Sequence, residues 1–149
     1  METNDALMSP DELLAALNDL LEAERAGVKV ALAGRKAAET ETMGAFMTGL
    51  RDDEARWCAM LAGQIKRLGG SPSGACGAFY DKVMALDEPV ERLALLNRGQ
   101  GWVVRKLDAM IPRVKDEVLR ADLREMADSH VENIAETDQL ILEIRSGGD

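Results

Sequence analysis

The sequence predicts an all-α protein, folded as an antiparallel four-helix bundle. Its 149 residues are rich in strong helix formers, and only 3% are aromatic, a composition that disfavours a β-sheet protein. Over four long segments, apolar residues recur at the spacing of three and four that places them on one face of a helix. Only one stretch, residues 71–77, is dense in residues that break helices.

The first helix is predicted over residues 10–38. Ser9 can cap its first turn, Pro10 suits the first helical position, and Glu12 completes a capping box with Ser9. The apolar residues at helical spacing are Leu13, Leu17, Leu20, Leu21, Val28 and Ala31.

The second helix is predicted over residues 41–68. Thr40 and Thr42 mark the turn before it, and the pair Gly69-Gly70 ends it. The apolar residues at helical spacing are Phe46, Met47, Leu50, Trp57, Cys58, Leu61, Ile65 and Leu68.

Residues 69–86 are predicted to be the crossover between two halves, with a short helical turn near residues 79–86. The third helix is expected over 87–111 and the fourth over 114–145, separated at Pro112. Their inward residues are expected to be Val90, Leu93, Leu96, Val103, Val104, Leu107 and Ile111, and then Val118, Leu119, Leu123, Met126, Ile134, Leu140 and Ile141. Four such helices, each about 40 Å long, with short links and one longer one, favour a single antiparallel domain over 1–149.

Charge and composition exclude several function classes. The net charge of −9 would repel a phosphate backbone, so no nucleic-acid partner is expected. No apolar run is long enough to cross a membrane, and the N-terminus does not look like a signal peptide, so we expect a cytoplasmic protein. One histidine leaves no Ser/His/Asp triad, and no phosphate-binding GxxxxGK[ST] loop is present.

Polar residues interrupt each apolar face near the middle of its helix. Because helix middles share one level in an antiparallel bundle, we expect these side chains to meet in one layer of the core. Glu22 and Glu132 lie about 200° around their helices from that layer and should face water. The interrupting residues are Glu24, Glu54, Asn97, Gln100 and His130.

The two halves also share a spacing. Thirty residues separate Glu24 from Glu54, and thirty separate Asn97 from Ala127. A shift of 73 residues pairs Glu24 with Asn97, Glu54 with Ala127, and Trp57 with His130.

This pattern resembles the ferritin-like superfamily, especially its rubrerythrin-like members. In that superfamily each half supplies a Glu from its first helix and Glu-x-x-His from its second, which together build a carboxylate-bridged di-iron site. Residues 20–27 (LLEAERAG) and 53–58 (DEARWC) look like the corresponding segments, and the resemblance spans about residues 10–143. Residues 97–102 (NRGQGW) resemble an uncharacterised bacterial ferritin-like family, which implies a fold but no activity.

The resemblance implies six metal ligands, and three of those positions depart from it. Trp57 stands where one His is expected, while Asn97 and Ala127 stand where two Glu are expected. A complete di-iron site needs bridging carboxylates from both halves, so the sequence implies at most a reduced, mononuclear or vestigial version.

Glu24, Glu54 and His130 are therefore the candidate metal ligands, with Asn97, Gln100 and Trp57 expected beside them. Two carboxylates and an imidazole suit Fe, Mn or Zn, and a bound cation would offset the burial of the two acids.

Two other interpretations of the layer stay open. It can be a hydrogen-bonded network without metal, in which His130 bonds Glu24 or Glu54, or it can be a small-molecule pocket. The function is accordingly either a metal-binding oxidoreductase or a non-enzymatic helical module that binds a partner or ligand.

Several residues outside the layer also carry predictions. Trp102 lies off the main apolar face, where it either covers the edge of the bundle or lies in a dimer contact. We expect a homodimer, and the sequence does not indicate any other physiological partner. Gly99 and Gly101 indicate either a close approach to a neighbouring element or a helix distortion. Cys58 is expected to be inert beside the core, and Cys76 to be exposed, as a plain or a reactive thiol.

Overall fold

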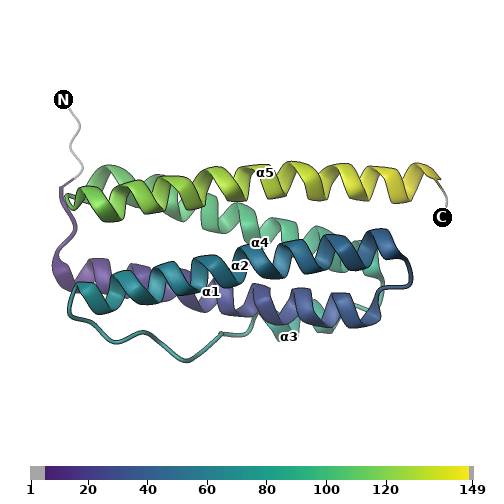
Figure 1. Ribbon diagram of the computed structural model, residues 1–149, viewed down its shortest axis with the longest axis horizontal. Helices are drawn as coiled ribbons and strands as arrows, with labels where there is room; N and C mark the ends of the chain where they lie inside the picture. The colour runs from purple at the N-terminus through teal and green to yellow at the C-terminus, as the bar shows by residue number, and fades with distance from the viewer. Residues whose placement is uncertain (1–5, 148–149) are drawn as a thin grey trace.

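The computed structural model describes residues 6–147, and these form a bundle of four long helices. The long helices are α1 (Pro10–Ala37), α2 (Glu41–Arg67), α4 (Pro89–Met110) and α5 (Glu117–Gly147). Helix α1 packs on α2 and α4, and α5 packs on α4 and α2, so that every neighbouring pair is antiparallel (Figure 1). The predicted all-α, antiparallel bundle is confirmed for the described residues.

Capping side chains set the starts of the first two long helices. The Ser9 hydroxyl accepts a hydrogen bond from the Glu12 backbone, and the Glu12 carboxylate accepts one from Ser9, completing the predicted capping box. The Thr40 hydroxyl likewise accepts from the backbone of Met43 at the start of α2. The predicted bounds of both helices agree with the structure to within one residue.

The predicted starts of the last two long helices were too early. The expected helix over 87–111 begins at Pro89, because the Glu88 side chain caps the backbone N–H groups of Val90 and Glu91. The expected helix over 114–145 begins at Glu117, after a 3-10 turn at Ile111–Arg113. Asp116 caps this helix by accepting from the Leu119 backbone.

The apolar faces pack into the core with corrections on three helices, and Val104 and Ile134, both predicted to point inward, are only half-buried. Val118 was predicted to point inward but is 60% exposed; its neighbour Leu119 is fully buried, and adjacent positions of a helix lie about 100° apart around its axis, so both cannot face the core centre. On α1 the buried valine is Val30, and Val28 is only half-buried. The largest core cluster lies at the end of the bundle where α1 begins and includes Leu17, Leu20, Leu21, Trp57, Leu61, Ile65, Leu107, Leu119, Leu123 and Met126.

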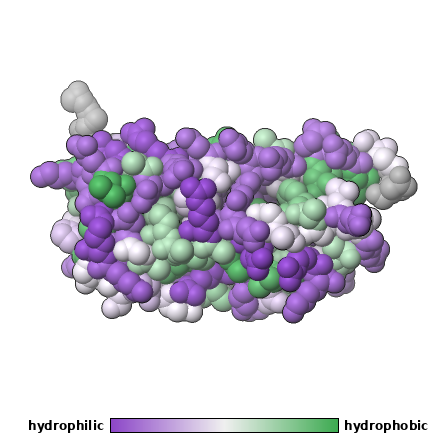
Figure 2. Space-filling model, in the orientation of Figure 1, coloured by the Kyte–Doolittle hydropathy of each residue, from purple (hydrophilic) through white to green (hydrophobic). Residues whose placement is uncertain are grey.

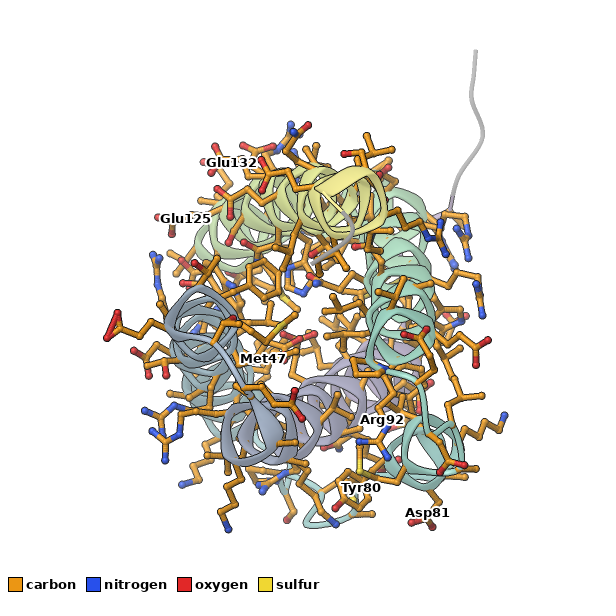
Figure 3. All side chains as sticks on the ribbon, turned by 90° about the vertical axis from the view of Figure 1, so that its right-hand side faces the viewer. Met47, Tyr80, Asp81, Arg92, Glu125 and Glu132 are labelled. Atoms are coloured by element: carbon orange, nitrogen blue, oxygen red, sulfur yellow. The ribbon has the colours of Figure 1, made fainter. Side chains whose placement is uncertain are left out.

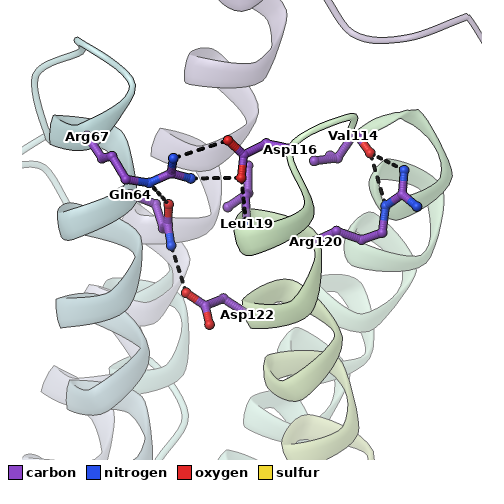
Figure 4. A network of polar contacts seen from close by, with 7 residues as sticks. All are labelled: Gln64, Arg67, Val114, Asp116, Leu119, Arg120 and Asp122. Atoms are coloured by element: carbon purple, nitrogen blue, oxygen red, sulfur yellow. Dashed lines mark hydrogen bonds and ion pairs between the residues drawn. The ribbon is translucent and has the colours of Figure 1, made fainter.

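A polar network fastens α2 to α5 at this end (Figure 4). The Arg67 guanidinium donates to both carboxylate oxygens of Asp116, at 2.9 and 3.1 Å. The amide of Gln64 donates to Asp122 at 2.7 Å and accepts from Arg67. The bidentate geometry fixes the register between these two helices.

The crossover returns along the length of the bundle, because α2 and α4 run in the same direction (Figure 1). Its first part is tied to α1, where Asn18 donates to the Ser71 carbonyl and Glu22 accepts from the Ser73 hydroxyl. Its second part contains α3 (Phe79–Met84), the predicted short helical turn. Viewed along the bundle, α3 with Tyr80 and Asp81 lies outside the ring of four helices, beside α1 and α4 (Figure 3).

One of the two glycines on α4, Gly99, is explained by this α3 contact. A Cβ at Gly99 would lie 2.7 Å from the ring of Phe79, so the residue permits a close approach of α3 to α4. Helix α4 is continuous through Gly99 and Gly101, so the close-approach interpretation is confirmed for Gly99. A Cβ at Gly101 would meet only the Arg105 side chain of the same helix, at 3.3 Å, so Gly101 shows no close approach of another element.

The surface carries no membrane signal within residues 6–147. None of the described helices is both long and apolar enough to span a bilayer. On the face drawn in Figure 2, hydrophilic residues predominate and hydrophobic ones form separate patches. Trp102 is 43% exposed, with the Lys106 ammonium 5.5 Å from its ring centre, and the homodimer stays a prediction.

Candidate metal centre

Glu24, Glu54 and His130 meet in the middle of the bundle. They come from α1, α2 and α5, and one potential ligand atom of each lies within 4.8 Å of the others. Their exposed fractions are 1%, 3% and 0%. The expectation that these three side chains share one buried level is therefore confirmed.

The orientation of the His130 ring is set by its own helix. Its Nδ1 lies 2.9 Å from the Met126 carbonyl oxygen, one turn earlier on α5. Because a carbonyl can only accept, Nδ1 carries a hydrogen and donates it. Nε2 is then the ring atom that faces Glu24, at 3.1 Å from Oε2.

The Glu54 carboxylate fits against a helix position that has no side chain. A Cβ placed on Gly27 would overlap both carboxylate oxygens of Glu54, so α1 makes room for this acid only with glycine there. The sequence analysis did not single out Gly27, although it lies three residues after Glu24, on the same side of α1.

Burial and mutual repulsion control the protonation of the site. Burial raises the pKa of Glu54 well above its ordinary value, and the charges of Glu24 and Asp53 raise it further. Burial alone would lower the pKa of His130, but the hydrogen bond and charge of Glu24, with smaller contributions from Met126 and Asp53, raise it overall. Without a cation, the site therefore retains protons that exposed groups would release.

Several buried polar atoms around the site have no hydrogen-bond partner among the described residues. They include one oxygen of each acid, and an unpaired buried oxygen is destabilising unless something else binds it. The atoms are Glu24 Oε1, Glu54 Oε1, the Trp57 indole nitrogen and both amide atoms of Gln100.

These features fit a divalent cation. Two donor atoms that are each about 2.1 Å from one metal ion lie about 3.0–3.4 Å apart, and the His130–Glu24 distance of 3.1 Å falls in this range. The unpartnered carboxylate oxygens supply further acceptors. The set of two carboxylates and one imidazole suits Fe, Mn or Zn.

Asn97 and Trp57 do not join the three candidate ligands. The Asn97 amide donates to the Ile134 carbonyl and to Asp138, at 3.3 and 2.8 Å, so that it links α4 to α5. The indole nitrogen of Trp57 has no hydrogen-bond partner among the described residues. The ring is 1% exposed and fills the core, with Arg56 stacked on it at 4.4 Å.

Sequence reasoning missed the continuation of the polar layer along α5. Asn133 and Thr137 are both buried, and the Thr137 hydroxyl donates to the Asn133 carbonyl at 2.7 Å. They lie three and seven residues after His130, which is the helical spacing that could have identified them. Thr137 satisfies its hydroxyl within its own helix, and the Asn133 Nδ2 atom has no partner among the described residues.

The acids expected to face water divide into two cases. Glu132 is exposed and lies on the outer side of α5, as Figure 3 shows. Glu22 is half-buried, because the crossover covers it and Ser73 donates to its carboxylate at 2.7 Å. Neither residue belongs to the cluster of candidate ligands.

The two cysteines differ in environment. Burial is the main cause that raises the pKa of Cys58 to about 12, which disfavours the thiolate and supports the expected inertness. Cys76 was expected to be exposed but is half-buried, with the Lys29 ammonium 3.7 Å from its sulfur.

Comparison with known proteins gives a family and a fold. The model of the family described as "Domain of unknown function (DUF6306)" matches residues 11–139. The chain belongs to this family. Among curated proteins, no match was found.

Two solved structures have the same architecture. One, from Bacillus anthracis, is described as a ferritin-like, diiron-carboxylate protein; it is 20% identical with a TM-score of 0.80, over 90% of this chain and 99% of its own. The other is a two-domain protein from Anabaena variabilis with DJ-1/ThiJ/PfpI-like and ferritin-like domains. It is 12% identical with a TM-score of 0.74, over 95% of this chain and 39% of its own. The fold of this DUF6306 protein is ferritin-like, as predicted.

Proposed function

We propose that this protein binds one divalent transition-metal ion through Glu24, Glu54 and His130, and that it serves as a metal-dependent oxidoreductase with a reduced version of a di-iron site. The observation that supports this most directly is the pair of buried acids, each with an unpartnered oxygen, beside an imidazole held in a fixed orientation. Fe or Mn bound there would supply one-electron redox chemistry, whereas Zn would supply only Lewis acidity.

A single ion is favoured over two because the second half of the bundle lacks ligands. Ala127 has no donor atom, and the Asn97 amide nitrogen is already bonded to α5. The Trp57 indole nitrogen can only donate a hydrogen bond, so it cannot replace a histidine ligand. The positions that would complete a second metal site thus offer no carboxylate or imidazole.

The residues of this chain have separate tasks in the proposed site. Met126 orients His130 by accepting from Nδ1, which leaves Nε2 facing the acids. Glu54 supplies a second carboxylate, and its Oε1, which has no hydrogen-bond partner among the described residues, would be free to bind the ion. The buried ring of Trp57 helps to exclude water from the site.

The structural relatives support the metal proposal in outline. The Bacillus anthracis protein is described as diiron-carboxylate, so the same arrangement of helices can present carboxylates to iron. This chain would bind a metal at the same place in the bundle, with three of the six ligands.

The competing proposal is a non-enzymatic helical module whose polar layer is an empty network. One observation favours it: His130 Nε2 and Glu24 Oε2 lie 3.1 Å apart, so the two side chains can satisfy each other by a hydrogen bond. In that case the protein would act by binding a partner or a small ligand.

Metal analysis of purified protein separates the two proposals. After reconstitution with Fe(II), Mn(II) or Zn(II) in turn, we expect about one equivalent of at least one ion, and a background amount in His130→Ala. Glu132→Ala, a change two residues away on the exposed side of α5, is the matched control and should retain the metal. Background metal in the unaltered protein with all three ions would exclude the metal site and leave the empty network.

A further inference from the structure

A cavity of about 560 Å³ connects the surface with the candidate metal centre. Its outer lining includes the exposed residues Asp19, Lys82, Arg98 and Trp102. Its inner lining includes Glu24, Glu54 and Gln100, all at most 3% exposed. The volume lies within the range of pockets that bind small organic molecules.

The walls between the two ends are mostly apolar. They are formed by α1 and α4, with the end of the crossover and α3 alongside, and Figure 1 shows these elements next to one another. The wall residues include Ala23, Phe79, Leu95, Leu96 and Val103. A ligand that passes from the surface to the metal centre would thus meet an apolar surface along its sides.

Gln100 is the neutral polar side chain at the inner end. It is 3% exposed, and neither its amide nitrogen nor its amide oxygen has a hydrogen-bond partner among the described residues. Asn97, three residues earlier on α4, bonds α5 through its amide nitrogen instead. A buried carboxamide with both atoms unpaired is a ready acceptor and donor for a ligand.

The charges at the inner end narrow the class of ligand. Glu24 and Glu54 line the same end, so an anionic ligand group would be repelled or would have to be neutralised. A neutral carboxamide carries an acceptor oxygen and a donor nitrogen on the same carbon, and the two can pair with the nitrogen and oxygen of the Gln100 amide.

We propose that this cavity is a binding pocket for a small, mainly apolar carboxamide, whose amide group pairs with Gln100. That such a ligand is the substrate rests on the proposed function, because the pocket ends at the metal centre. Binding itself does not rest on it, since Gln100 and the apolar walls are present with or without a metal ion.

Calorimetric titration with three probes of one shape tests the pocket. The probes are naphthalene-2-carboxamide, naphthalene-2-carboxylate and methylnaphthalene, which share an apolar body and differ in the polar group. We expect the carboxamide to bind at one equivalent and about tenfold or more tighter than either of the others. No binding of the carboxamide, or equal affinity for all three probes, would overturn the proposal.

Gln100→Met keeps the size of the side chain and removes both amide atoms. It should weaken carboxamide binding about tenfold or more and leave methylnaphthalene binding unchanged. Gln139→Met, on the exposed side of α5, is the matched control and should change neither affinity. Unchanged carboxamide affinity in Gln100→Met would refute the role of Gln100. If Gln100→Met does not fold, Val103→Phe narrows the same cavity and should weaken binding of all three probes.

The outcome is separable from that of the metal proposal. Carboxamide binding should persist in His130→Ala, a variant that lacks one of the proposed ligands and is expected not to bind metal. Metal binding without carboxamide binding contradicts only the pocket, and carboxamide binding without metal contradicts only the proposed function.

Discussion

The two helical hairpins of the bundle treat their central polar residues differently. In the α1–α2 hairpin, Glu24 and Glu54 are buried with one oxygen each unpartnered among the described residues. In the α4–α5 hairpin, the equivalent Asn97 binds its own hairpin partner through Ile134 and Asp138. The first hairpin thus buries two carboxylates with unpartnered oxygens, whereas the unpartnered buried side-chain atoms described on the second hairpin belong to the neutral amides of Asn97, Gln100 and Asn133.

This difference separates the features that serve function from those that serve stability. Unsatisfied buried acids destabilise a protein, so their retention on one hairpin is a sign of use rather than of packing. His130 is the exception on the second hairpin: its Nε2 faces Glu24 across the bundle. The candidate site therefore belongs to the first hairpin, completed by one ring from the second.

The largest effect is expected where the first hairpin makes room for Glu54. Gly27→Ala places a methyl group in the volume of the Glu54 carboxylate, which must move out of the site. We expect metal affinity to fall about tenfold or more and the free energy of unfolding to fall by about 1–3 kcal/mol. Metal titration and chemical denaturation measure the two effects.

Gly63→Ala is the matched control for this glycine. It is an exposed position in α2 where an added Cβ meets nothing within 4 Å. The variant should bind metal as the unaltered protein does and be more stable by about 0.5–1 kcal/mol, because alanine has a higher helix propensity than glycine. Equal behaviour of the two variants would show that Gly27 does not shape the site.

The second hairpin is tested by Asn97→Ala. Loss of the bonds to Ile134 and Asp138 should lower the free energy of unfolding by about 1–2 kcal/mol. Metal content should stay at the level of the unaltered protein, because Asn97 bonds α5 and not the candidate ligands. A metal content that falls together with stability would mean that the two hairpins share the site more equally than inferred.

Glu54→Gln in metal-free protein tests how the buried acid of the first hairpin makes stability depend on pH. Because the pKa of Glu54 is raised in the folded state, its contribution to stability is full below pH 4.5 and is lost as pH rises toward the folded-state pKa. His130, whose pKa is also raised, adds a loss of the same sign above pH 6.5.

Glutamine cannot ionise, so the variant should be more stable than the metal-free parent at pH 7, by about 1–2 kcal/mol. The gap should widen with pH from 4.5 upward, as followed by thermal melting in a chelator. In metal-loaded protein the order should reverse, since a ligand is missing. A large drop in the melting temperature of the metal-free variant would contradict the assignment of Glu54 as an uncompensated acid.

The smallest effect is expected at the surface contact between the hairpins. The Arg56–Glu125 pair spans α2 and α5 at 2.9 Å, but both side chains are more than half exposed. Glu125→Ala should therefore change stability by less than about 0.5 kcal/mol, and less still in high salt. A larger loss in denaturation experiments would show that surface charges, rather than core packing, hold the hairpins together.

The sequence predicted the helices well and their starts less well. The spacing of apolar residues shows which segments are helical, because only a helix brings such positions to one face. The starts of α4 and α5 depend on which side chain caps the helix, and neither the Glu88 cap nor the Asp116 cap follows from periodicity. Val118 was misplaced because it adjoins Leu119, and the apolar spacing alone did not show which of the two faces the core.

The candidate site was predicted as a set of residues but not as a geometry. Interruptions of the apolar faces identified Glu24, Glu54 and His130, because charged residues at core positions are rare. The hydrogen bonds of the residues around them could not be predicted from spacing. The Asn97 amide donates to Asp138 on α5, and the Trp57 indole nitrogen has no partner among the described residues. Gly27 became significant only once the position of the Glu54 carboxylate was known.

The bond from His130 to Met126 lies wholly within α5. Within the folded protein, the direction of the imidazole is therefore set by a bond inside a single helix. Both carboxylates belong to the α1–α2 hairpin, so an ion bound by the three side chains would join that hairpin to the α4–α5 hairpin. Its removal should loosen their docking and leave each hairpin helical.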